Sequence, residues 1–330
     1  MRPFVFHMPV RVVFGVGRVL ELRAAIPADL RRILLVTDPG LTNHGAALKA
    51  VGQALEGRTW EVFDEVEENP TFAAAERGAA RARACGAQAV IGLGGGSPMD
   101  AAKGVALLST NEGGLGEYLR GRSHERPPLP IVAIPTTSGT GSEVTPYAVF
   151  TDVETRTKGA LSHPSLFPLL SLIDPALTHS MPEALVVATG LDVLAHAVEA
   201  YLSTDAFPVN DSVALEAIET VLANLPAARR KEPLAMDAMA YASMLGGIAI
   251  THASTILPHH GISPHRVPWC AARRRECGAA ARVPSLPGRP FHRPREGRAA
   301  DAHAGATRRI GGLPGGPRCV VPAEDLRRYG

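Results

Sequence analysis

The order of strand-like and helix-like stretches constrains the fold of this 330-residue chain most strongly. Within the first 180 residues, short apolar runs over residues 33–37, 89–93 and 131–134 read as buried parallel strands. Residues 4–14 alternate as a strand or hairpin, and residues 73–85 have the composition of a helix. Strands that alternate with helices build a parallel sheet, whose ligands bind beyond the carboxyl ends of the strands.

The pattern changes after Asp174-Pro175, where only helix-like stretches follow. Residues 182–202, 209–225 and 234–250 are apolar-rich with helical spacing, and no strand-like run separates them. We therefore expect an α/β domain with a parallel sheet over residues 1–178 and an all-helical domain over residues 179–259.

The end of the chain has a different composition. Residues 261–330 hold 14 arginines, no lysine and five acidic residues, a net charge of +9, whereas residues 1–260 carry 20 basic and 27 acidic residues. Nine prolines and ten glycines fall in the same 70 residues, which lack helical and strand periodicity. We treat residues 260–330 as an aberrant tail. Such a basic run ordinarily suggests a nucleic-acid partner. GC-rich codons translated in the wrong reading frame give the same composition without selection for any partner, so we expect no nucleic-acid partner.

The overall composition is that of an ordinary globular protein. Hydrophobic residues make up 45% and charged residues 20%, which excludes a disordered chain. No eighteen apolar residues run uninterrupted and no signal-peptide pattern opens the chain, so no membrane partner is expected. Four cysteines form no disulfide framework. The expected location is the cytoplasm.

Two loops of small residues directly follow predicted strands. Gly94-Gly-Gly-Ser-Pro-Met-Asp100 opens a helix, where glycines let backbone N–H groups approach a phosphate. Pro135-Thr-Thr-Ser-Gly-Thr-Gly-Ser-Glu143 follows the next strand. Each loop alone is also compatible with a plain turn, the first capped by Ser97. Together they indicate a nucleotide in the crevice between them, although neither standard phosphate-binding fingerprint is complete.

A carboxylate and an imidazole share one face of the first long helix. Asp192 and His196 are four residues apart and suit a divalent first-row metal. The alternative is a hydrogen-bonded pair in the core. Further ligands would come from elsewhere, and His252, His259 and His260 cluster at the end of the third helical stretch.

Together these residues resemble the iron-containing (group III) alcohol dehydrogenase family. The resemblance covers residues 1 to about 259. It rests on the two loops with Lys103, on Asp192-x-x-x-His196, on Thr251-His-Ala-Ser-Thr-Ile-Leu-Pro-His259 and on Glu68-Asn69-Pro70-Thr71. It implies a dinucleotide-binding α/β domain followed by an all-helical metal-binding domain.

The resemblance also implies the site residues. Three metal ligands, for Fe²⁺ or alternatively Zn²⁺, would be Asp192, His196 and His259; His252 and His260 are not expected to take part. The residues expected to contact the cofactor are Asn69, Gly95, Gly96, Ser97, Asp100, Thr136, Thr137, Ser142 and Lys158.

Asp38 ends a predicted strand and bears on the choice of cofactor. A carboxylate there can accept from the adenosine ribose and would repel a 2′-phosphate, which favours NAD over NADP. The alternative is that Asp38 only starts the Asp-Pro-Gly turn.

The implied reaction is reversible hydride transfer between a primary or secondary alcohol and NAD. The enzyme would act on a small-molecule alcohol or aldehyde and form a homo-oligomer. Two alternatives stay open: a relative of glycerol dehydrogenase or maleylacetate reductase, and a catalytically impaired nucleotide-binding remnant.

The resemblance fails at the fourth metal ligand. In the family this ligand is a histidine in Pro-His-Gly, fourteen residues after the third, but the chain has Arg273 there. Codons for residues 269–277, read one base later, permit Gly-Val-Pro-His-Gly-Ala-Ala-Asn-Ala, which is family-like. These matches indicate a reading-frame shift between His259 and His260, in the gene or in its sequencing.

Resequencing the gene across the codon for His259 tests the frame shift. We expect the corrected sequence to have one base fewer or two bases more there, the changes that give a reading one base later, so that it encodes Pro-His-Gly in place of the sequence around Arg273. An unchanged reading in independent DNA and transcript samples would show that the gene itself encodes the arginine-rich tail. A corrected frame without Pro-His-Gly would contradict the inference.

Overall fold

The computed structural model describes residues 3–255. All of these residues belong to one compact unit. The predicted ligand His259 and the tail over residues 260–330 lie outside the described residues.

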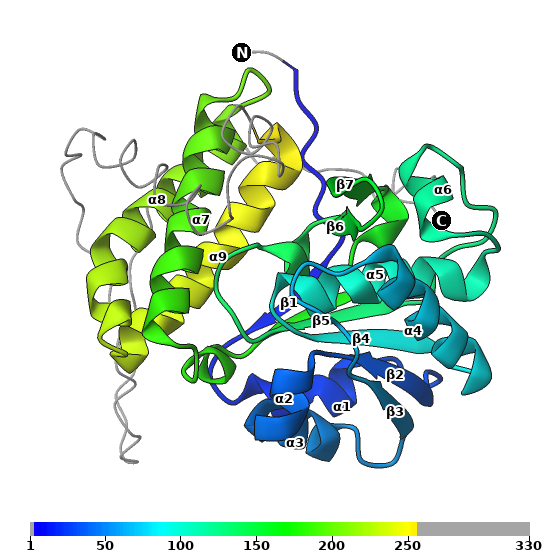
Figure 1. Cartoon of the computed structure of the whole chain (residues 1–330). Helices are drawn as coiled ribbons and strands as arrows, with labels where there is room; N and C mark the ends of the chain where they lie inside the picture. The colour runs from blue at the N-terminus through cyan, green and yellow to red at the C-terminus, as the bar shows by residue number, and fades with distance from the viewer. Residues whose placement is uncertain (1–2, 256–330) are drawn as a thin grey trace, which may run out of the picture. The chain divides into compact units, whose positions relative to one another are not determined.

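A six-stranded parallel sheet organises the first part of the chain, as the sequence predicts (Figure 1). In spatial order its strands are β1 (Arg11–Phe14), β8 (Leu170–Ile173), β5 (Ile131–Pro135), β4 (Ala89–Gly94), β2 (Arg32–Val36) and β3 (Thr59–Phe63). The expected strand over residues 4–14 is shorter, since only β1 pairs.

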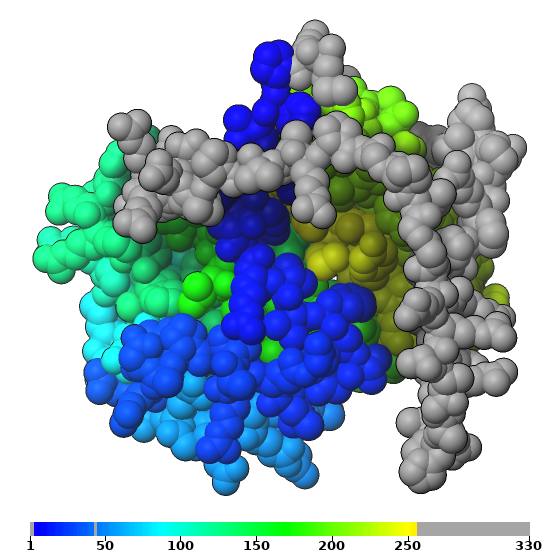
Figure 2. Space-filling view, turned by 180° about the vertical axis from the view of Figure 1, so that it is seen from behind, coloured from blue at the N-terminus to red at the C-terminus, as the bar shows by residue number. Residues whose placement is uncertain are grey.

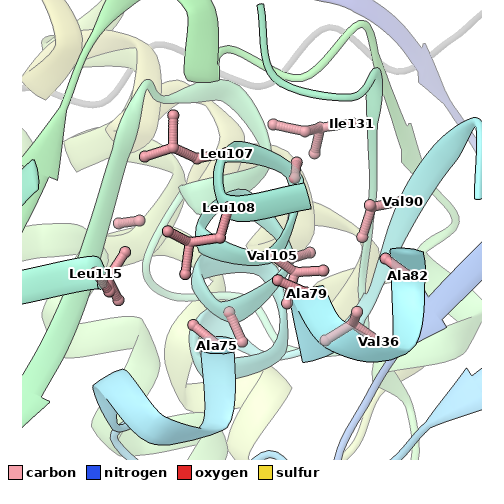
Figure 3. Close-up of a cluster of buried hydrophobic side chains, with 14 of the residues drawn as sticks. Val36, Ala75, Ala79, Ala82, Val90, Val105, Leu107, Leu108, Leu115 and Ile131 are labelled. Atoms are coloured by element: carbon pink, nitrogen blue, oxygen red, sulfur yellow. The ribbon is translucent and has the colours of Figure 1, made fainter. Parts of the chain in front are cut away.

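Alternate residues of the central strands face two different cores. In β2, Leu34 and Val36 pack on one side of the sheet and Ile33 and Leu35 on the other, and all are 1% exposed or less. The first side is covered by α4 (Phe72–Ala84), α5 (Gly96–Thr110) and α6 (Leu115–Leu119), whose core is drawn in Figure 3. The second side is covered by η1 (Arg18–Glu21), α1 (Leu22–Ala25), α2 (Pro39–His44) and α3 (Ala46–Ala54).

An antiparallel hairpin was not expected from the sequence. It consists of β6 (Tyr147–Asp152) and β7 (Thr157–Ser162). Its Phe150 is fully buried against α5, where a Cβ on Gly104 would come within 2.7 Å of the ring. Short 3-10 turns complete this part: η2 (Ser142–Val144), η3 (Pro164–Leu166) and η4 (Pro175–Thr178).

The second part of the described chain consists of three packed helices (Figure 1). They are α7 (Glu183–Leu202), α8 (Pro208–Arg229) and α9 (Pro233–Ala253). This arrangement confirms the predicted fold class. Helix α8 continues through Pro226, where the sequence predicted its end. The proposed domain boundary between residues 178 and 179 falls between η4 and α7 and stays a prediction.

By length and composition alone, α7 and α9 could each cross a membrane. The uninterrupted-run criterion applied to the sequence did not detect them, because polar residues interrupt both helices. In the structure, 56% and 61% of their apolar windows are buried, as in helices of a protein core.

The extended segment before β1 lies along α9. His7 contacts His252 through both its N–H and its carbonyl, at 3.4 and 3.2 Å from the same ring nitrogen, and Phe6 stacks on the His252 ring. Figure 2 shows this segment in dark blue beside yellow α9.

Glycines let the loop after β5 approach the helices. A Cβ on Gly247 of α9 would lie 2.6 Å from the carbonyl oxygen of Gly141 and 2.7 Å from Val144. A Cβ on Gly139 would lie 2.7 Å from Thr189 of α7. The loop therefore packs directly on both helices.

We expect Gly247→Ala to destabilise the protein by about 1–3 kcal/mol, because its methyl group collides with backbone that cannot move aside cheaply. Gly246→Ala is the matched control on the same helix, since its Cβ would lie 3.3 Å from the Val193 side chain and no closer than 3.7 Å to any backbone atom of its neighbours. Urea unfolding measures both variants. Equal stability of the two variants would contradict the account.

Candidate cofactor and metal site

The first loop follows β4 and begins α5. Gly94 has φ of 146°, and a Cβ there would lie 2.6 Å from Pro98, so the turn requires glycine. Gly95 caps α5, and neither a side-chain cap nor an acidic residue occupies the first turn of this helix. Such a helix start suits an anion, because its first backbone N–H groups point outward.

The second loop follows β5 and touches the first. The N–H of Thr136 donates to the carbonyl of Gly94 at 2.9 Å. A Cβ on Gly95 would lie 3.2 Å from the Thr137 hydroxyl, and one on Gly96 would lie 2.7 Å from Thr140. The two loops therefore meet at the carboxyl ends of neighbouring parallel strands, where nucleotides bind in such sheets.

Two expected cofactor residues from distant parts of the chain are linked to the first loop, Asn69 directly and Lys158 through Asn69. The N–H of Asn69 donates to Ser97 Oγ at 3.2 Å, and Lys158 Nζ donates to Asn69 Oδ1 at 2.7 Å. Asn69 has φ of 61°, a conformation that asparagine tolerates better than most residues. The structure thus joins Asn69, Ser97 and Lys158 in one hydrogen-bonded series.

Asp38 has a capping role and also lies beside the first loop. Its Oδ1 accepts from the N–H of Leu41 at 3.1 Å, which caps α2. Its Oδ2 lies 3.4 Å from the position of a Cβ on Gly94. The turn-starting alternative is therefore present in the structure, and the contact with ribose stays a prediction.

Asp100 and Ser142 form a buried cluster with Lys103. Ser142 Oγ donates to Asp100 Oδ1 at 2.6 Å, and the N–H of Val149 donates to Asp100 Oδ2 at 2.8 Å. Burial raises the pKa of Asp100, and the nearby Lys103 ammonium opposes the rise. Because these groups already have protein partners, their direct contact with the cofactor stays a prediction.

Burial also shifts the pKa of Lys103 and that of Glu143, whose charge interacts with Lys103. Burial lowers the pKa of Lys103 to about 8, against the opposing charges of Asp100 and Glu143. Burial raises the pKa of Glu143 to about 7, and Lys103 opposes that rise. At neutral pH, Lys103 therefore stays predominantly protonated.

Asp192 and His196 lie on α7 and are 8% and 7% exposed. Thr189, one turn earlier, packs against Gly139 in the middle of the second loop, so this loop lies against the helix that bears both residues. A buried carboxylate and imidazole fit a divalent cation chemically. Among residues 3–255 no group of three or more metal-ligating side chains is assembled, and the proposed third ligand, His259, is outside that range.

His252 has backbone contacts of its own. Its Nδ1 lies 2.9 Å from the Ile248 carbonyl oxygen and its Nε2 lies 3.2 Å from that of His7. These contacts support the expectation that His252 is not a metal ligand.

Three residues of the quoted motifs received no role from the sequence. Thr140 faces Gly96, and Lys103 and Glu143 are buried. Besides its place in the family motif, Lys103 stood out in the sequence as a charged residue in the apolar stretch of α5, three residues after Asp100. That signal indicates a buried ion pair with Asp100, but it does not show that Lys103 also binds Ser142 and Tyr147.

Comparisons with known proteins agree with this geometry. Residues 9–175 match the family model "Iron-containing alcohol dehydrogenase", and residues 186–265 match "Fe-containing alcohol dehydrogenase family, C-terminal". The chain is 39% identical to alcohol dehydrogenase 4 of Schizosaccharomyces pombe over 254 residues, 76% of this chain and 60% of that protein. It is 33% identical to NAD-dependent methanol dehydrogenase of Bacillus methanolicus over 77% of this chain and 68% of that protein.

A solved structure is similar as well. Sulfoacetaldehyde reductase from Bifidobacterium kashiwanohense, in complex with NAD⁺, has 31% identity and a TM-score of 0.77, with 83% of this chain and 74% of that chain covered. The chain thus spans about 60% of the length of the Schizosaccharomyces pombe relative and about three quarters of the solved structure. The chain belongs to the iron-containing alcohol dehydrogenase family.

Proposed function

We propose that this chain is a metal-dependent alcohol dehydrogenase that transfers hydride reversibly between a primary or secondary alcohol and NAD. One observation carries the proposal: the two loops meet at the ends of β4 and β5, and the second packs on the helix that bears Asp192 and His196. A nucleotide bound between the loops would therefore lie next to the proposed metal ligands. The NAD-linked relatives support the choice of cofactor.

Each part of the site has a role in this proposal. The N-terminal amides of α5, with Gly95, Gly96 and Ser97, bind the pyrophosphate, and Asp38 accepts from the ribose. Asp192 supplies negative charge and His196 a neutral imidazole to hold the cation, with His259 as third ligand. When bound, the metal ion supplies Lewis acidity toward the alcohol oxygen, and NAD supplies the hydride acceptor.

A nucleotide-binding protein without catalysis is the second candidate. It is favoured by Arg273, which occupies the place of the family's fourth ligand. NAD-linked alcohol oxidation together with metal analysis of the purified chain separates an enzyme from a binder. A panel of alcohols and glycerol, with maleylacetate as a reduction substrate, separates the first proposal from relatives with other substrates.

The remaining parts of the proposal concern organisation. We propose a cytoplasmic homo-oligomer that acts on a small molecule and has neither a nucleic-acid nor a membrane partner. The domain limits 1–178 and 179–259, with the aberrant segment 260–330, belong to the same proposal.

We expect His196→Ala in the 330-residue chain to weaken Fe²⁺ or Zn²⁺ binding by roughly tenfold or more. Losing even an outer-shell partner of a ligand costs about 10–100-fold in metal affinity. Competition with a chelator measures the affinity, and His252→Ala is the control, since its ring contacts the backbone carbonyls of Ile248 and His7. Unchanged metal affinity in His196→Ala would remove this residue from the site.

We expect Asp38→Asn to improve NADPH binding relative to NADH several-fold. Asparagine keeps the cap of α2 but removes the charge that would repel a 2′-phosphate. Asp38→Gly should shift the preference similarly, at the cost of the capping side chain. Fluorescence titration with both dinucleotides measures the preference. Equal or tighter binding of NADPH than of NADH by the unmodified chain would contradict the role of Asp38.

A further inference from the structure

We infer that Lys103 is a positioning residue: its buried ammonium holds the second loop at a fixed place against α5, and thereby sets the crevice between the two loops. The inference rests on the proposed function, because it assigns a role to that crevice. Lys103 itself does not contact the nucleotide in this account.

The close hydrogen-bond partners of Lys103 lie at the end of the second loop and just after it. Its side chain is completely buried, and Nζ lies 2.8 Å from the Ser142 carbonyl, 2.7 Å from Ser142 Oγ and 2.6 Å from the Tyr147 carbonyl. An ammonium has three N–H donors, and three close acceptors use all of them. The cation thus ties α5 to η2 and to the start of β6.

Asp100 completes the connection from the same helix. Its Oδ1 lies 3.9 Å from Lys103 Nζ and accepts from Ser142 Oγ, while its Oδ2 accepts from the N–H of Val149. The Ser142 hydroxyl therefore accepts from Lys103 and donates to Asp100. Two charged residues one turn apart on α5 therefore hydrogen-bond to Ser142, at the end of the second loop farther from β5.

The position of this loop matters on both of its sides. Thr137 and Thr140 face Gly95 and Gly96 of the first loop, and Gly141 packs on α9. A shift of the loop end at Ser142 would change both the spacing between the two loops and the packing of the second loop on the helices. The near end is fixed by β5, and the lysine network fixes the far end together with the packing of Gly141 on α9.

The energetics argue for positioning over stability. A buried charge costs free energy of solvation, and apolar residues often replace buried ion pairs with no loss of stability. A lysine at this position is therefore expected to contribute more to a defined loop geometry than to folding. Its ammonium remains charged at neutral pH, because burial lowers its pKa only to about 8.

The test compares Lys103→Met with the unmodified 330-residue chain. We expect the Kd for NADH, measured by fluorescence titration, to rise roughly tenfold, since that is the scale of a lost hydrogen bond from a charged group. Hydrogen exchange without cofactor should become faster for amides in residues 136–149 and stay unchanged in the sheet. Lys103→Gln, which keeps two N–H donors, should show intermediate values and provides a second variant if the first folds poorly.

Val105→Ala is the matched control on α5. It removes packing against α4 but does not touch the network, because Val105 faces Gly78. We expect it to lose stability and keep the parent's NADH affinity. If Lys103→Met and Lys103→Gln bind NADH like the parent and their loop amides exchange at the parent's rate, the inference is overturned. If the parent itself binds no NADH, the proposed function fails, and the exchange comparison still decides whether Lys103 holds the loop.

Discussion

The contact between the two loops at the carboxyl ends of β4 and β5 is the constraint on which the rest of the site depends. It exists because β4 and β5 are parallel neighbours, so that the loops that follow both strands leave the sheet at the same edge. Glycines at Gly95 and Gly96 let the threonines of the second loop come close. The same loop packs on α7 through Gly139 and on α9 through Gly141, and α7 is the helix that carries Asp192 and His196.

Much of the fold could be predicted from local patterns. Continuous apolar runs marked β2, β4 and β5 because a strand covered on both faces has no polar side. Helical spacing marked α7 and α9 to within a few residues. The loops of the site could also be predicted, since both begin where a buried strand ends.

Other features depend on contacts that no local pattern encodes. The β6–β7 hairpin mixes exposed and buried residues, and Phe150 is placed by its fit against Gly104. Helix α8 passes Pro226 because packing against α7 and α9 outweighs the missing hydrogen bond. The partners of Lys103 lie about forty residues away, so sequence spacing could not identify them. Asp38 caps α2 with Oδ1 while its Oδ2 faces Gly94, so a cap and a contact with ribose are compatible roles.

The central claim is that one crevice, lined by the two loops, binds the nicotinamide cofactor beside α7. A crystal structure of the 330-residue chain grown with NAD⁺ tests it most directly. The account predicts density for the pyrophosphate between the amides of residues 95–97 and the hydroxyls of Thr137 and Thr140, with the nicotinamide directed toward Asp192 and His196. A dinucleotide bound elsewhere, or empty loops at a saturating NAD⁺ concentration, would contradict it.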